Sequence, residues 1–388
     1  MQKRLSVVLV CLVGLLPTLS FARPASADTA YGTTFVVPAS IEATGTLDVS
    51  DALNDWLRTG TEDGTLSAPN RIVLRGTFRV EYGLTLGNTG PSSRAHPRLP
   101  AYTRNHVVLD LRDATLLQID ATAYQRSHGV ITEPRKRWGV PLLKIIGATD
   151  VEVLGGSLRS TNAGGKYSMA REPWHGVVIA GGSHIRLTDL RIANVWGDFV
   201  YITPRQGLAR DVTISGGIYA HNGRQGITLN GVNGLDISGV EFRDVQRELF
   251  DHEPGAKGGL MNVDIHDTFG TSGGLGYVNL RALKATPLQN FKIRNNRLDR
   301  GHFRVAVSTP GSTRAGFVFD GNTTAETRPY KGRSPLVDLR GSGFVGVTIT
   351  RNHDVGEQGR LPFRVSPTSS GVTTTPNDFV GFGSHMGD

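Results

Sequence analysis

The sequence of 388 residues lacks several features that define common classes of protein. It has a single cysteine, Cys11, so no disulfide can form within the chain. After the N-terminal region no segment approaches 18 consecutive apolar residues, which excludes a membrane-spanning helix. There is no dense run of Lys and Arg and no nucleic-acid-binding motif, so nucleic acid is a poor candidate partner. Leucine-rich repeats of the Leu-x-x-Leu-x-Leu type are also absent.

The N-terminal residues 1–27 have the pattern of a secretory signal peptide. Lys3 and Arg4 form the basic start, Leu5–Leu16 is a short apolar stretch, and Ala25–Ala27 is a small-residue cleavage site. The one cysteine lies inside this signal, so the mature chain has none. Export without disulfides predicts a secreted bacterial protein that is stabilised by a long core.

The charge balance gives weak information about a partner. The sequence has 42 basic and 34 acidic residues, and removal of Lys3, Arg4 and Arg23 with the signal leaves 39 basic residues and a net charge of +5. This excess is compatible with an acidic polymer such as a uronic-acid glycan. It is equally compatible with a charge that only keeps the protein soluble.

Pairs of apolar residues two positions apart return eight times along the chain. They are Val151/Val153, Ile185/Leu187, Val212/Ile214, Leu235/Ile237, Val263/Ile265, Phe291/Ile293, Phe317/Phe319 and Val347/Ile349. A spacing of two places both side chains on one face of a strand. The return every 23 to 34 residues is typical of a stacked repeat whose coils bury their inner faces against one another.

A second series of such pairs keeps register with the first. Its members are Leu143/Ile145, Val177/Ile179, Val200/Ile202, Ile227/Leu229, Phe250/His252, Val278/Leu280, Val305/Val307 and Val337/Leu339. Each coil therefore has at least two strands, joined by turns rich in Gly, Asn and Asp. Asn296, Asn322 and Asn352 each lie three residues after a pair of the first series, which predicts a stack of turn asparagines bonded to the backbone.

Strands that stack in parallel without intervening helices predict an all-β fold, a single-stranded parallel β-helix of about 8–10 coils. The segments Trp196–Ile202, Asn222–Ile227 and Phe250–Pro254 are similar to the right-handed β-helix proteins of the pectate-lyase-like superfamily. This resemblance spans roughly residues 65–355 and implies a right-handed solenoid. It does not select a reaction, because that superfamily contains lyases, hydrolases, epimerases and non-enzymes.

The regions outside the repeat are expected to cover its two ends. The predicted organisation is a signal peptide over 1–27, a cap segment over 28–64, the β-helix over 65–365 and a C-terminal cover or flexible tail over 366–388. In the cap segment, Ser50 is expected to cap a short amphipathic helix with Leu53, Trp56 and Leu57 on one face. Such a helix would close the open N-terminal edge of the β-helix.

Two long insertions, at roughly residues 121–140 and 159–175, come before strands of the second series and should overhang the same edge. Insertions in solenoids cluster on the binding face. Alternation along the second series then brings chemically capable side chains to the outside of roughly four coils. The candidates for catalysis are Asp198, Asp251, Glu248, Glu253 and Tyr201, and those for substrate binding are His175, Trp174, Arg224, Gln225, Arg247 and Arg281.

One interpretation is a secreted enzyme that hydrolyses the glycosidic bonds of a polysaccharide. Neighbouring coils stack at about 4.8 Å, so Asp198 lies roughly 9–10 Å from Glu248 and Asp251. That separation is in the range of inverting glycosidases. Repulsion between the carboxylates would raise the pKa of one of them, as a general acid requires. We expect hydrolysis with Asp198 and Asp251 as the acid and base pair, slightly ahead of the alternatives.

A second interpretation is a polysaccharide lyase that acts on a uronic-acid glycan by β-elimination. Arg224, Arg247 or Arg281 would neutralise the uronate carboxylate, and Tyr201, His175 or a further arginine would remove the adjacent proton. A calcium ion held by Asp251 and Glu253 with Asp198 would replace the arginines. No cofactor is required for hydrolysis, so the sequence leaves metal dependence open.

The third interpretation is a non-catalytic glycan-binding or structural β-helix. The Arg-x-Pro-x-x-Arg segment of classical pectate lyases and the Gly-His-Gly of polygalacturonases are both missing. Asp251 and Glu253 would then only pair with arginines in a surface network. His252 occupies an inward position and is expected to be a core residue. The sequence does not indicate an oligomeric state.

Overall fold

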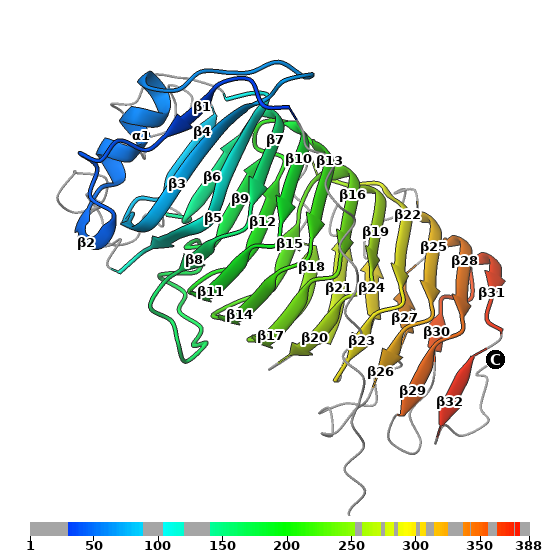
Figure 1. Ribbon diagram of the computed structural model, residues 1–388. Helices are drawn as coiled ribbons and strands as arrows, with labels where there is room; N and C mark the ends of the chain where they lie inside the picture. Colours follow the sequence, from blue (N-terminus) through cyan, green and yellow to red (C-terminus); the bar gives the residue numbers. More distant parts are fainter. Residues whose placement is uncertain are drawn as a thin grey trace, which may run out of the picture.

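The computed structural model describes residues 30–87, 104–119, 140–252, 258–272, 276–282, 286–299, 303–307, 314–324, 337–341, 343–355, 363–375 and 377–380. The predicted signal peptide over 1–27 lies outside these residues. The chain winds into a right-handed parallel β-helix, which confirms the predicted fold. Figure 1 shows the coils as one stack, from the blue N-terminal end with its single helix to the red C-terminal end.

Each regular coil has three strands, one more than the two apolar series indicate. β12 (Val200–Thr203), β13 (Ala209–Ser215) and β14 (Ile218–Asn222) form one such coil. The first strand of each coil joins a ten-stranded parallel sheet, and the other two join a twenty-two-stranded sheet. The ten strands of the smaller sheet agree with the expected number of coils.

The strands of the ten-stranded sheet, in spatial order, are β4 (Leu84–Gly87), β6 (Leu143–Ile146), β9 (Val177–Ala180), β12, β15 (Ile227–Leu229), β18 (Glu248–His252), β21 (Gly276–Ala282), β24 (Phe303–Val307), β27 (Val337–Arg340) and β30 (Phe363–Val365). The larger sheet begins with β1 (Thr34–Val36), β2 (Thr44–Asp48), β3 (Asn70–Arg79) and β5 (Val107–Leu117). One row of it continues with β7 (Thr149–Leu154), β10 (Ser183–Thr188), β13, β16 (Val232–Ser238), β19 (Leu260–His266), β22 (Leu288–Arg294), β25 (Arg314–Asp320), β28 (Val345–Thr350) and β31 (Ser370–Thr373). The other row has β8 (Ser157–Arg159), β11 (Arg191–Val195), β14, β17 (Glu241–Val245), β20 (Phe269–Ser272), β23 (Arg297–Leu298), β26 (Thr323–Thr324), β29 (His353–Val355) and β32 (Asp378–Val380).

The two apolar series form the core as predicted. The register pairs Ile185 with Val151 of the preceding coil and with Val212 of the next. Every member of the first series is buried, and so is every member of the second whose side chain is described. Full burial of such a side chain stabilises the fold by about 1.5–3 kcal/mol relative to exposure. The third strand adds one or two buried apolar residues per coil, such as Leu158 on β8 or Ile192 and Val195 on β11. The two residues on β11 are three positions apart, so no pair with a spacing of two marks this strand in the sequence.

The predicted asparagine stack is confirmed, and it extends one coil further. Asn322 donates from Nδ2 to the carbonyl of Ile293 at 2.9 Å and to Oδ1 of Asn352 at 2.9 Å. Asn296 makes the equivalent bonds one coil earlier, and Asn377 continues the stack beyond Asn352. These buried amides supply hydrogen-bond partners to backbone groups at the turn of each coil. Buried backbone polar groups need such partners, because they are cut off from water.

The single helix among the described residues, α1 (Ser50–Thr59), covers the N-terminal end. Leu53 and Leu57 are fully buried against the first coils. Asn54 fixes the helix to the ten-stranded sheet, because its Nδ2 donates to the carbonyl of Gly83 at 2.8 Å. The expected cap was wrong by one position. The helix begins at Ser50 itself and has no side-chain cap.

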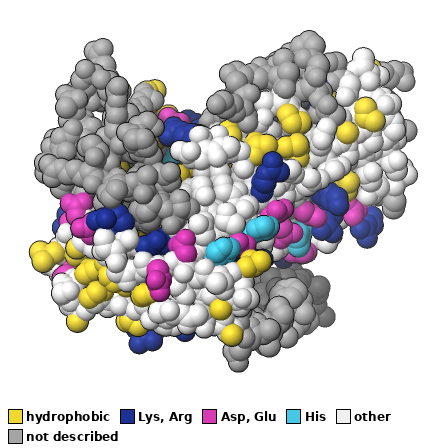
Figure 2. All heavy atoms as spheres, turned by 90° about the horizontal axis from the view of Figure 1, so that it is seen from above, with side chains coloured by type: hydrophobic (Ala, Val, Ile, Leu, Met, Phe, Trp, Pro, Cys, Tyr) yellow, Lys and Arg dark blue, Asp and Glu magenta, His cyan; other side chains and the backbone are white. Residues whose placement is uncertain are grey.

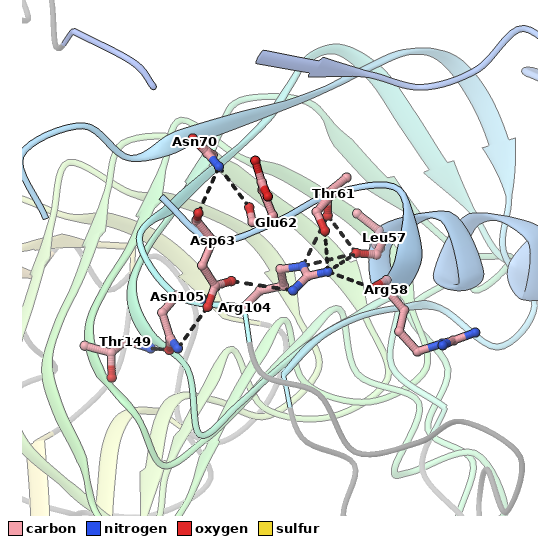
Figure 3. A network of polar contacts seen from close by, with 9 residues as sticks. All are labelled: Leu57, Arg58, Thr61, Glu62, Asp63, Asn70, Arg104, Asn105 and Thr149. Carbon is pink, nitrogen blue, oxygen red and sulfur yellow. Dashed lines mark hydrogen bonds and ion pairs between the residues drawn. The ribbon is translucent and has the colours of Figure 1, made fainter. Parts of the chain in front are cut away.

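The C-terminal end of α1 is held by a buried arginine (Figure 3). Nη2 of Arg104 donates to the carbonyls of Leu57, Arg58 and Thr61 at 2.8, 2.8 and 2.6 Å. The carbonyls of Leu57 and Arg58 are ones that the end of a helix leaves without an intrahelical donor, and Thr61 lies just beyond the helix. Asp63 lies 3.6 Å from Nη1 of the same guanidinium. The network therefore ties the cap to the start of the β-helix.

A histidine–aspartate ladder lies on the outside of the larger sheet. His106, Asp150, His184 and Asp211 come from four successive coils, and each has a positive φ near +50°. His106 directly precedes β5, and the other three lie near the start of β7, β10 and β13. Ring nitrogens and carboxylates alternate at 3.1, 3.2 and 3.5 Å. Figure 2 shows histidine side chains among acidic ones on the face seen from above. This row is distinct from the outward face of the ten-stranded sheet.

Candidate functional site

The candidate site lies at the edge where the chain enters successive strands of the ten-stranded sheet. Two residues before the paired positions Val177, Val200 and Ile227, three polar side chains stack from coil to coil: His175, Asp198 and Gln225. The fourth coil supplies Glu248, the first residue of β18. The parallel register therefore brings together the row that alternation along the second series predicted.

Asp198 is the centre of this site and is completely buried. Its Oδ2 accepts hydrogen bonds from Nη1 of Arg224 at 2.8 Å and from Oγ1 of Thr228 at 2.7 Å. Its Oδ1 accepts from the backbone N–H of Gln225 at 3.1 Å. A carboxylate with 0% exposure and three donors cannot reach a glycan. The prediction that Asp198 forms an acid and base pair with Asp251 remains untested, but this geometry favours a positioning role.

Arg224 links this carboxylate to the long turn over 160–176. Its Nε lies 2.7 Å from Oε1 of Glu172, while its Nη1 contacts Asp198. The guanidinium is only 5% exposed, and Glu172 is 27% exposed. Two carboxylates on one buried arginine compensate its desolvation, and they fix the turn over the coil edge. The expected insertion over 159–175 thus contributes a residue to the site, as insertions in solenoids often do.

His175 and Tyr201 form the most chemically versatile pair. Their rings stack at 4.6 Å with an angle of 14°. Nδ1 of His175 accepts a hydrogen bond from the backbone N–H of Asp198 at 3.0 Å. Burial, reinforced by the positive charges of Arg224 and Arg205, holds the pKa of His175 well below its usual value. The imidazole is therefore neutral at pH 7 and carries its proton on Nε2.

The hydroxyl of Tyr201 accepts a hydrogen bond from Nδ2 of Asn230 at 3.0 Å. The phenol is half-buried, whereas His175 is 6% exposed. A tyrosine hydroxyl that accepts one bond can still donate its own proton. The pair therefore presents a reactive hydroxyl beside a neutral imidazole.

Asp251 and Glu248 lie on the next coil, at 3% and 5% exposure. Nε2 of Gln225 donates to Oδ2 of Asp251 at 3.2 Å, so Gln225 lies between Asp251 and Asp198. Oε1 of Gln225 is buried and has no hydrogen-bond partner. A buried acceptor without a donor is costly, and it marks a place where a ligand hydroxyl would be stabilised.

Aromatic and cationic side chains line the same edge. Trp174 is buried with Tyr82 and Val140, and Trp196 packs against this group. Arg171 lies 4.2 Å from the ring of Trp196. Arg247 lies 4.3 Å from the ring of Tyr167, which stands on the 160–176 turn. Trp174 is thus largely covered, and Trp196 is the more accessible of the two indoles.

Three parts of the prediction lie outside what the structure describes. They are Glu253, the insertion over 121–140 apart from Val140, and the side chain of Arg281, whose backbone belongs to β21. A calcium ion on Asp251 and Glu253 therefore stays a prediction. Within the described ranges no group of three or more His, Cys, Asp or Glu side chains is arranged to hold a metal ion.

Four residues that the fold places at or near this site were not among the predicted candidates: Glu172, Thr228, Asn230 and Lys144. Glu172 lies inside an insertion, where there is no strand whose alternation would predict the direction of a side chain. Thr228 and Lys144 belong to the same outward row as Tyr201, because the register pairs Tyr201 with Thr228 and with Val178, and Val178 with Lys144. Their position in that row was the available signal.

Compared by sequence, the chain matches no protein-family model and no curated protein. Compared by structure, it is similar to ORF18 of Geobacillus virus E2, with a TM-score of 0.57 and 12% identity over 90% of this chain and 62% of the viral one. The chain thus spans less than two thirds of the viral protein's length. This likeness shows the shared fold.

Two further solved structures were found at lower similarity. An exopolygalacturonase from Thermotoga maritima has a TM-score of 0.47 and 11% identity over 84% of this chain and 76% of the other. The tailspike protein of E. coli bacteriophage HK620, solved in complex with a hexasaccharide, has a TM-score of 0.45 and 11% identity over 90% and 78%. These structural neighbours are carbohydrate-active or carbohydrate-binding β-helix proteins. In the part of the chain that the structure describes, no helix has the length and apolarity to cross a bilayer.

Proposed function

We propose that this chain is an exported protein that binds a polysaccharide along the outward face of the ten-stranded sheet and cleaves it there. One observation carries the proposal: the buried network of Glu172, Arg224 and Asp198 lies outside the core, beside His175 and Tyr201. Burial of charged groups costs free energy, and the stability of the solenoid does not require such groups. Charged and titratable groups held rigidly at a surface are typical of functional sites.

The geometry supports β-elimination better than the hydrolysis that the carboxylates suggested. Hydrolysis with Asp198 requires that carboxylate to reach the glycan, and its three donors and full burial oppose this. Elimination requires a group that accepts a proton from the carbon beside a uronate carboxylate. Tyr201, once its hydroxyl has lost its proton, is such a group, and the hydrogen bond from Nδ2 of Asn230 would stabilise the phenolate. The imidazole of His175 has its Nδ1 occupied by the N–H of Asp198 and a proton on Nε2, so it serves as a hydrogen-bond donor beside Tyr201, with the positive charges of Arg224 and Arg205 close to it.

The proposed step balances without any added reactant. The base removes the proton at C5 of a uronate residue, the C5 electron pair forms the C4–C5 double bond, and the C4–O bond breaks. The leaving oxygen takes up a proton from Tyr201 or from water. Products are a chain with a new reducing end and a chain with an unsaturated uronate at its non-reducing end. Asp198 acts as a positioning residue that holds Arg224 and the backbone N–H of Gln225.

A second candidate is hydrolysis by the carboxylates on β18. Asp251 belongs to the outward row and Glu248 is the first residue of the same strand, and Asp251 accepts a hydrogen bond from Gln225, whose unpaired Oε1 would bind a sugar hydroxyl. This arrangement supplies two carboxyl groups without Asp198. The Asp251→Asn variant separates the two reactions, because it should stop hydrolysis but should leave elimination by Tyr201 and His175 largely intact.

The test is a screen of the mature protein on acidic and neutral polysaccharides, with calcium and with a chelator. Reducing ends and absorbance near 235 nm are followed together. Elimination raises both, whereas hydrolysis raises only the reducing ends. We expect Tyr201→Phe to lower kcat by roughly 10²–10⁴-fold with the fold intact. Tyr219→Phe is the matched control, because its hydroxyl is buried in the core without a partner and its loss should leave activity unchanged. Glycan binding without turnover on every polymer would overturn the enzymatic proposal.

A further inference from the structure

Lys144 is a buried lysine with no counter-ion among the residues that the structure describes. It lies on β6, in the outward row of the ten-stranded sheet, and is 8% exposed. Its Nζ lies 3.9 Å from the ring centroid of Tyr82. Among the described residues no carboxylate pairs with it.

The elements packed against Lys144 present almost no charge to it. In the register, β4 places Thr85 beside it on one side and β9 places Val178 on the other. The turn before β4 supplies Tyr82, whose pKa is raised by burial and by the charge of Asp51, so the phenol stays neutral. The turn before β9 supplies His175, which is also neutral at pH 7. Nothing among these groups compensates the ammonium.

Two further acidic side chains near this end of the sheet are already engaged. Glu81, next to Tyr82, lies 2.7 Å from Arg79. Asp48 accepts hydrogen bonds from the backbone N–H groups of Ser50 and Glu81. Burial without a compensating charge lowers the pKa of Lys144 to about 7. A methionine or leucine would fill the same space without this desolvation cost.

Lys144 lies close enough to the candidate site to bind the same glycan chain. Lys144 and Tyr201 occupy the same outward row two rungs apart, which is roughly 10 Å at the stacking distance of a sheet. The aromatic group of Tyr82, Trp174 and Trp196 runs along the edge between them. Trp196 is the accessible ring of this group, and an accessible aromatic ring near a fixed cation is suited to a sugar ring that carries an anionic substituent.

We propose that Lys144, backed by the ring of Tyr82, forms a subsite for an anionic group, a carboxylate or a sulfate, on a sugar about two rungs from the His175–Tyr201 pair. This inference rests on the proposed function and narrows it, because it makes the substrate an acidic glycan. It also assigns a role to a residue outside the cleavage site. Lys144 binds and orients the chain, and it takes no part in the proton transfer.

The experiment measures the affinity of three probes by calorimetry: oligogalacturonate, oligomannuronate and a sulfated oligosaccharide, each beside its neutral or desulfated counterpart. Wild-type protein, Lys144→Met, Lys144→Arg and the control Lys292→Met are compared, since Lys292 is an exposed lysine on β22. We expect Lys144→Met to weaken binding of one acidic probe by at least ten-fold. Lys144→Arg should remain within a few-fold of wild type, and Lys292→Met should be unchanged. The probe that responds identifies the anion as a carboxylate or a sulfate.

The dependence of affinity on pH supplies a second readout. Because the ammonium deprotonates near pH 7, affinity of the wild type for the acidic probe should fall roughly ten-fold from pH 6 to pH 8. Lys144→Met should show no such fall. The subsite is refuted if Lys144→Met binds the acidic probe as tightly as wild type does. It is also refuted if Lys144→Met weakens the affinity for the acidic probe and for its neutral counterpart to the same extent. In both cases the proposed function stands. If wild type binds and cleaves no polysaccharide at all, the proposed function fails with it.

Discussion

Replacement of His252 by leucine should make the protein less sensitive to acid. His252 is the last residue of β18 and is fully buried in an inward position, where the register places it opposite Leu280. Its Nδ1 bonds to the carbonyl of Leu229, and its Nε2 has no partner. Burial lowers the pKa of His252 to about 4, against 6.5 when it is exposed, and the bond to Leu229 offsets only part of this.

The sign of the effect follows from proton binding in the two states. Between pH 6.5 and about 4 the unfolded chain binds a proton at His252 and the folded chain does not, so stability falls as pH falls through this range. With these two pKa values, the free energy of unfolding should decrease by about 2 kcal/mol between pH 7 and pH 5 through this residue alone. His252→Leu removes that contribution, and leucine suits the apolar row. His175 also has a lowered pKa, but it is present in both proteins and cancels in the comparison.

The assay is urea unfolding of both proteins at pH 7 and pH 5, followed by circular dichroism and tryptophan fluorescence. Coincident transitions are required, because a solenoid can unfold in parts. The wild type should lose about 2 kcal/mol more than His252→Leu on acidification. An equal loss in the two proteins would refute the interpretation of His252 as a buried neutral imidazole.

A control of opposite sign is available in His266. Burial opposes its charge, but contacts with Asp267 at 2.7 Å and Asp236 at 3.2 Å outweigh it and raise its pKa. Its stabilising contribution is therefore complete below the unfolded pKa of 6.5 and is lost as pH rises through the folded value. His266→Gln should thus be more destabilising at pH 5 than at pH 7.

Two further predictions concern the frame of the molecule. Arg104→Met should destabilise the protein by roughly 2–4 kcal/mol in urea unfolding, because it leaves the carbonyls at the end of α1 without their donor; Arg58→Met, which removes only an exposed pair with Asp55, should change stability by less than about 1 kcal/mol. Gly182→Ala should lower the melting temperature clearly more than Gly147→Ala. Both glycines have positive φ, but a Cβ at Gly182 would overlap the carbonyl oxygen of Ala148, whereas one at Gly147 meets nothing within 4 Å. Equal melting temperatures would mean that the coil relaxes around the added carbon.

The sequence alone determined the fold, because a parallel β-helix repeats one local pattern. Each pair such as Ile185/Leu187 must face the core, and aligning each pair with the next one along the chain fixes which residues stack. The same regularity placed His175, Asp198 and Gln225 in one row and put His252 inside. The asparagine stack was predictable for the same reason. When a residue type recurs at the same position of each repeat, its spacing along the chain predicts which residues contact one another in neighbouring coils.

Only the tertiary structure decided what the site residues do. Alternation gives the side of the sheet but not the depth of a side chain, so it marked Asp198 as an accessible acid although three donors enclose it. Glu172 approaches Arg224 from an irregular turn, which has no period to read. Whether Lys144 meets a compensating charge depends on neighbours from β4, β9 and two turns at once, and those described supply none. Burial and charge compensation are properties of the assembled surroundings, and no single strand encodes them.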